Sequence, residues 1–67
     1  MKNYVRKIRK EKGLSCEALA RKIGMASTDL SKLERGIRFP YPGWRRRIAE
    51  GLNTPESALF PEETASA

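Results

Sequence analysis

The chain has 67 residues and a net charge of +6, with 14 Lys and Arg, 8 Asp and Glu, one Cys and no His. A domain of this size buries only about 60% of its unfolded surface, so its core is small. Histidine is absent and there is one cysteine, so the common zinc ligands and the usual general base are lacking. We therefore expect no enzyme, metal or cofactor. All 14 basic residues lie at or before Arg47, where four acidic residues leave a net charge of +10, a pattern that indicates a polyanionic partner.

The first two expected helices each begin with a capping residue. Asn3 is placed to cap a first helix in which Val5 and Ile8 face inward, and Gly13 ends this helix. Ser15 then caps the second helix. We therefore expect two short helices with a tight connection between them.

Two helical patterns joined by a three-residue turn occupy residues 14–36. The first pattern ends at Gly24, as a left-handed terminal residue requires, and the third helix runs from about Ser27 to Arg35 before Gly36. The two helices must pack closely across this short turn. Their inward positions are Leu19, Ala20, Ile23, Leu30 and Leu33.

The segment after Gly36, IRFPYPG, contains too much proline for regular structure. Trp44, Ile48 and Leu52 then recur every four residues, which predicts a fourth helix. We expect Thr54 to cap a short fifth helix.

This fifth helix is expected to have Pro55 at its first position and to continue through Leu59, where its apolar end closes the core together with Phe60. The residues that follow are small, polar and acidic. We therefore expect one domain over residues 1–60 and a disordered acidic tail over residues 61–67.

The pattern of residues 14–36 resembles the helix-turn-helix domains of phage repressors and Cro proteins. The matching positions are Gly13 to Ser15, Leu19-Ala20, Ile23-Gly24, Leu30, Leu33 to Gly36, Val5, Ile8, Arg9, Pro40, Ile48-Ala49 and Leu52. The resemblance covers roughly Val5 to Phe60. It implies an all-α, compact five-helix lambda-repressor-like domain with the helix-turn-helix at its second and third helices. It also implies a transcriptional regulator that binds double-stranded DNA sequence-specifically.

The outward face of the third helix is the predicted base-contacting surface. At about 100° per residue, the direction opposite Leu30 and Leu33 is occupied by polar side chains. The resemblance implies that four of them contact bases in the major groove, and their chemistry suits this role. The four are Ser27, Thr28, Ser31 and Lys32. The alternative is an ordinary solvated helix face.

Two residues of this helix leave alternatives open. Asp29 either accepts a hydrogen bond from cytosine or interacts with the helix amino end or Lys32, and we favour the second role. Ala26 stands where the resemblance implies a capping Ser or Thr. Either the cap is lost or Ser27 takes it over and starts the helix one residue later.

The phosphate contacts are expected beside this face. Backbone N–H groups of Cys16 and Glu17 at the amino end of the second helix are placed to hold a phosphate, although the resemblance implies Gln at position 16. A helix amino end also lowers the pKa of a thiol, so a redox-sensing Cys16 and a passive small residue are two further alternatives. Other phosphate candidates are Arg35, Arg38 and Arg46, the last because only it in the run 45–47 points directly away from the apolar stripe.

The resemblance further implies a structural ion pair between Arg9 and Glu34 that ties the first helix to the end of the third. It also implies a homodimer, at least on DNA, bound to a two-fold symmetric operator. The apolar residues left for that interface are Phe39, Tyr41, Pro42 and Phe60, unless they only complete the core.

A different class of function remains open: a protein-interaction module on the same fold, such as an antitoxin, or the DNA-binding domain of a larger repressor. The basic outward face argues against a purely protein-binding role. No apolar run reaches the roughly 20 residues of a membrane span and no signal-peptide pattern is present. We therefore expect a cytoplasmic, nucleoid-associated protein of a prokaryote or phage.

Overall fold

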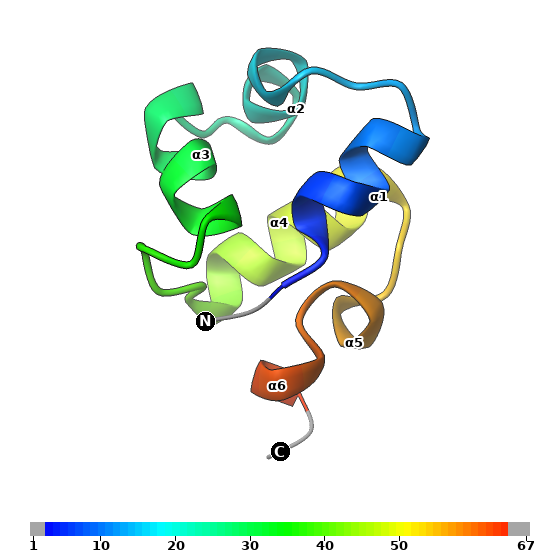
Figure 1. Ribbon diagram of the computed structural model, residues 1–67, viewed down its shortest axis with the longest axis vertical. Coiled ribbons are helices and arrows are strands. Elements are labelled where there is room, and N and C mark those ends of the chain that lie inside the picture. Colours follow the sequence, from blue (N-terminus) through cyan, green and yellow to red (C-terminus); the bar gives the residue numbers. More distant parts are fainter. Residues whose placement is uncertain (1–2, 65–67) are drawn as a thin grey trace.

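The computed structural model describes residues 3–64 and is all-α (Figure 1). The helices are α1 (Val5–Glu11), α2 (Cys16–Ile23), α3 (Ser27–Glu34), α4 (Pro42–Leu52), α5 (Glu56–Leu59) and α6 (Pro61–Thr64). The five expected helices are confirmed, and α6 is an addition. No helix in this part of the chain has the length and apolar character needed to cross a membrane.

One apolar core holds the helices together. Helix α2 packs against both α3 and α4, while α1 also contacts α2 and α4, and α5 contacts α4 (Figure 1). Burial of apolar side chains in this core is the main force that stabilises helices too short to form alone. The core consists of Val5, Leu19, Ala20, Ile23, Met25, Leu30, Leu33, Ile48, Leu52, Leu59 and Phe60.

Helix α2 has the predicted capping residues at its two ends, Ser15 and Gly24. The Ser15 hydroxyl accepts a hydrogen bond from the Ala18 N–H at 3.0 Å, and Gly24 ends α2 with φ of 73°. At the start of α3, Ala26 occupies the capping position and no side chain caps the helix. Ser27 is the first helical residue, so it does not take over the cap and remains on the outward part of α3.

The starts of the last two expected helices differ from prediction. Helix α4 already begins at Pro42, because proline suits the first position, where no intrahelical N–H bond is made. Pro55, in contrast, is at the capping position and α5 begins only at Glu56. The Thr54 hydroxyl donates to the Leu52 carbonyl at 2.9 Å, so its side chain serves the end of α4 instead of capping α5.

Hydrogen bonds of Asn3 and Tyr4 connect the start of α1 to other helices. The Asn3 amide donates to the Leu33 carbonyl at 2.9 Å while its oxygen accepts from the Val5 N–H at 3.2 Å. The Tyr4 N–H donates to the Leu59 carbonyl at 2.9 Å. The capping position of α1 is Tyr4 and no side chain caps the helix there, so the prediction that Asn3 is the cap is wrong; Asn3 lies one residue earlier and links the start of α1 to the end of α3.

The acidic segment expected to be disordered is helical in its first part. Pro61–Thr64 forms α6, with proline at its first position and acidic residues in its first turn, both of which favour a helix start. The helix follows directly on the fully buried Phe60 and contacts α5. The rest of the expected tail, residues 65–67, lies outside the described residues.

Candidate nucleic-acid interface

An open hollow lies between the amino end of α2 and the outward face of α3. Its volume is about 360 Å³. Every residue that lines it is a base or phosphate contact expected from the sequence. We call it the recognition hollow, and it is lined by Cys16, Glu17, Ser27, Thr28, Ser31, Lys32 and Arg35.

The side chains of the recognition hollow provide hydrogen-bonding groups and positive charge. Lys32 and Arg35 are exposed basic residues, against the single carboxylate of Glu17. Ser27 and Ser31 are half-buried and Thr28 is exposed. Hydroxyl and ammonium groups of this kind match the acceptors and donors at base edges, and the Thr28 methyl group suits a thymine methyl.

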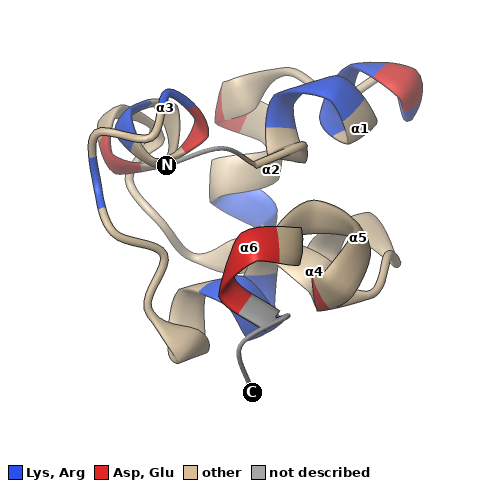
Figure 2. Cartoon of the chain, turned by 60° about the horizontal axis from the view of Figure 1, so that its bottom comes forward, with Lys and Arg blue, Asp and Glu red and all other residues tan. Residues whose placement is uncertain are grey.

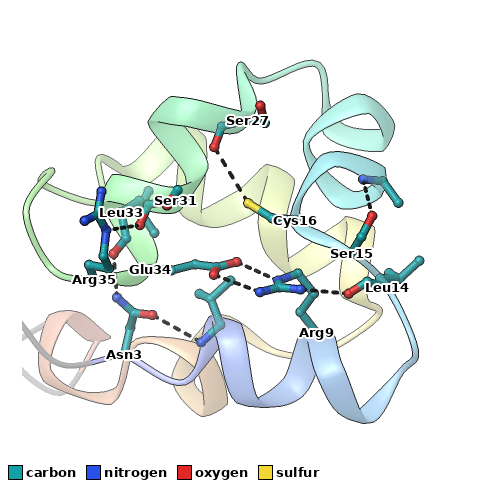
Figure 3. Close-up of polar contacts among 12 residues, drawn as sticks. Asn3, Arg9, Leu14, Ser15, Cys16, Ser27, Ser31, Leu33, Glu34 and Arg35 are labelled. Carbon is teal, nitrogen blue, oxygen red and sulfur yellow. Dashed lines mark hydrogen bonds and ion pairs between the residues drawn. The ribbon is translucent and has the colours of Figure 1, made fainter.

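Cys16 links the two helices that form the hollow. Its thiol donates to the Ser27 carbonyl at 3.7 Å (Figure 3). Burial raises the pKa of the Cys16 thiol, and the charge of Glu34 adds to this rise while that of Arg9 opposes it. The expectation that the helix amino end lowers this pKa is wrong, because desolvation of the thiolate prevails. A redox-sensing Cys16 has no support here.

Arg9 and Glu34 form the predicted ion pair between α1 and α3 (Figure 3). The Arg9 Nε donates to Glu34 Oε2 at 2.8 Å and Nη2 donates to Oε1 at 3.1 Å, while Nη1 donates to the Leu14 carbonyl at 2.8 Å. The two side chains are only 9% and 5% exposed. The hydrogen bonds with Glu34 raise the pKa of Arg9, although desolvation lowers it in part. The pair fixes the orientation of α3.

Asp29 has a partner that was not predicted. Arg38 Nη2 lies 3.2 Å from Asp29 Oδ1, and both side chains are about half exposed. Asp29 therefore pairs with a residue of the loop after α3, instead of with Lys32 or the helix amino end. The nine-residue separation gives no sequence signal, because the loop conformation alone brings the two charges together.

Arg38 also lines a neighbouring hollow of about 350 Å³, which we call the loop hollow. It adjoins the recognition hollow at Lys32, which lines both. The loop hollow is lined by Lys32, Ile37, Arg38, Phe39 and Tyr41. The predicted phosphate contact Arg38 is thus on the flank of α3.

The three consecutive arginines of α4 have different surroundings. Arg45 Nη1 donates to the Pro40 carbonyl at 2.7 Å and its Nε contacts Glu56 Oε1 at 3.4 Å, so this side chain holds the loop against α4 and α5. Arg47 lies over the Trp44 ring at 5.3 Å. Arg46 is exposed, as expected, but lines neither the recognition hollow nor the loop hollow.

The apolar residues assigned to a dimer interface separate into two groups. Phe39 and Tyr41 are 43% and 59% exposed and meet edge to face with ring centroids 4.8 Å apart, and Pro42 beside them is exposed. Phe60 is 0% exposed, so its assignment to the interface is corrected: the side chain is fully used in the core of its own chain.

Comparison with known proteins identifies the arrangement. A family model described as a helix-turn-helix domain matches residues 3–59. No curated protein matches the sequence. A solved structure titled "SinR protein/SinI protein complex" contains a chain with 30% identity and a TM-score of 0.80, and the match covers 94% of this chain and 62% of that one. The lambda-repressor-like fold inferred from the sequence is confirmed, and the chain belongs to the helix-turn-helix domain family.

Proposed function

We propose that this protein binds double-stranded DNA sequence-specifically and regulates transcription, with α3 in the major groove. The observation that carries the proposal is the recognition hollow, whose lining brings the four predicted base-contacting side chains beside the amino end of α2 and the basic residue Arg35. Lys32 would donate to guanine acceptors, and Ser27, Thr28 and Ser31 would donate to or accept from base edges. The amino end of α3 is the part of a recognition helix that enters the groove.

Phosphate contacts on both sides of α3 would fix its register. The first backbone N–H groups of a helix have no intrahelical partner, so those of Cys16 and Glu17 are available to a phosphate. Ser15 supports this end of α2 through its hydrogen bond with Ala18. On the opposite flank, Arg38 in the loop hollow supplies a guanidinium group, and Arg35 supplies another within the recognition hollow.

A domain of this size makes few contacts, so we propose that it acts as a homodimer on a two-fold symmetric operator. The half-sites would then be about 34 Å apart, one turn of the double helix. Phe39, Tyr41 and Pro42, which follow α3 along the chain and are exposed, are the candidates for the contact between copies. The family to which the chain belongs supports the DNA-binding role.

The test begins with selection of bound sequences from a random duplex pool, followed by affinity measurements on a selected and a random duplex. Lys32→Ala should weaken binding to the selected duplex by about 1–3 kcal/mol without changing the melting temperature, because Lys32 is exposed on α3. Lys12→Ala, at the far end of α1, is the control.

Two outcomes would change the assignment. An equal loss on selected and random DNA would make Lys32 a phosphate contact. A pool that shows neither binding nor enrichment would overturn the proposed function and favour the protein-interaction alternative.

A further inference from the structure

A second hollow, of about 440 Å³, lies on the α1 side of the recognition hollow. The two share Cys16, Ser31 and Arg35, so they adjoin each other. We call it the α1 hollow, and it is lined by Arg6, Arg9, Cys16, Ser31, Glu34 and Arg35. Arg6 lines neither the recognition hollow nor the loop hollow.

The α1 hollow carries a net positive charge that its own residues do not neutralise. Glu34 is the one acidic residue of its lining, and both carboxylate oxygens already accept hydrogen bonds from Arg9. Arg6 and Arg35 are exposed and add two further guanidinium groups. Figure 2 shows that basic residues occupy much of α1, whereas acidic residues occupy α6. The hollow therefore favours an anion.

The position of the hollow indicates which anion. A DNA strand places a negative charge about every 3.4 Å along the helix axis, so a strand held at the amino end of α2 continues past that end. The α1 hollow begins there, at Cys16, and extends to Arg6. A guanidinium group is suited to bind a phosphate through two parallel N–H donors.

We propose that Arg6 binds a backbone phosphate of the same duplex, so that the DNA contact extends from α2 onto α1. The inference rests on the proposed function and deepens it by adding a phosphate site. Arg9 is the positioning residue of this site: it occupies the Glu34 carboxylate and so leaves Arg6 and Arg35 for the phosphate.

The experiment measures the slope of log affinity against log salt on a selected duplex for the parent, Arg6→Gln, Arg6→Lys and Lys7→Gln. Lys7 is the matched control, because it is exposed on the same helix but does not line the α1 hollow. Arg6→Gln should reduce the magnitude of the slope by about 0.9, the value for one phosphate contact on B-form DNA. Arg6→Lys should retain most of the slope, and Lys7→Gln should change it much less than Arg6→Gln.

Equal slopes for Arg6→Gln and Lys7→Gln, at unchanged melting temperatures, would overturn the inference while the proposed function stands. Inorganic phosphate at constant ionic strength provides a further test. If it raises the melting temperature of the parent but not of Arg6→Gln, while the two proteins have the same salt slope on DNA, the hollow binds a free anion and the inference fails. Absence of DNA binding by the parent would instead overturn the proposed function itself.

Discussion

Gly51 of α4 lies directly against Ile23 of α2. A Cβ added at Gly51 would come within 2.6 Å of Ile23 Cγ2 and 3.2 Å of Leu19 Cδ1. The absence of a side chain at Gly51 therefore allows α4 to pack closely against α2. Gly43, in the first turn of the same helix, has no atom within 4 Å of its added Cβ.

We expect Gly51→Ala to destabilise the protein. Overpacking costs about 1–3 kcal/mol, which exceeds the gain in helix propensity of about 0.8–1 kcal/mol over most of that range. Gly43→Ala is the control, with the propensity gain but no clash. Thermal or urea unfolding gives the comparison, and equal stabilisation by both substitutions would contradict the close packing.

Loss of either partner of the Arg9–Glu34 pair should lower the free energy of unfolding by about 3 kcal/mol, because the remaining charge is then buried without its partner. Arg9→Ala also leaves the Leu14 carbonyl without its donor, so it should be the more destabilising change. Urea unfolding of both variants, with the exposed Lys10→Ala as control, measures the effect. Two variants as stable as the parent would show that the pair is immaterial.

Asp29→Asn should strengthen binding to selected and random DNA alike. The substitution removes a negative charge beside the proposed groove face and releases Arg38 from its ion pair. Stability should change little, because a half-exposed pair contributes about 0–1 kcal/mol. Affinities on both duplexes decide the matter: a loss confined to the selected sequence would instead assign Asp29 to a base contact.

Arg38→Gln and Arg46→Gln should each weaken binding similarly on all sequences. If each side chain contacts one phosphate, each change should reduce the salt slope by about 0.9. Lys12→Gln is the control, because Lys12 lies at the end of α1 and lines none of the three hollows described above. Unchanged slopes for both arginines, or an equal fall for Lys12→Gln, would mean that the wrong side of the domain has been assigned to DNA.

Cys16 should be alkylated by iodoacetamide more slowly in the folded protein than in urea, because burial raises its pKa and hinders access.

The stability contribution of the neutral thiol is present below the unfolded pKa of about 8.5 and is lost as pH rises through the higher folded value. Cys16→Ala should therefore show a smaller loss of stability at alkaline pH. Faster alkylation of the folded protein at neutral pH would restore the redox-sensing alternative.

The sequence by itself determined the helices that form the fold and the outward face of α3. Apolar spacing and the capping residues Ser15 and Gly24 act within a few residues, so they are legible in the local pattern. The resemblance to phage repressors added the Arg9–Glu34 pair, whose separation of 25 residues has no local signal.

Only the tertiary structure decided features that depend on distant segments meeting. The Asp29–Arg38 pair, the burial of Phe60 and the contact of Gly51 with Ile23 all require elements to be placed in three dimensions. The same holds for Cys16, whose pKa follows from desolvation by neighbouring elements and not from its position at a helix start. Local periodicity predicts which face of a helix is buried. Tertiary packing decides which residues contact that face and how exposed to solvent its side chains remain.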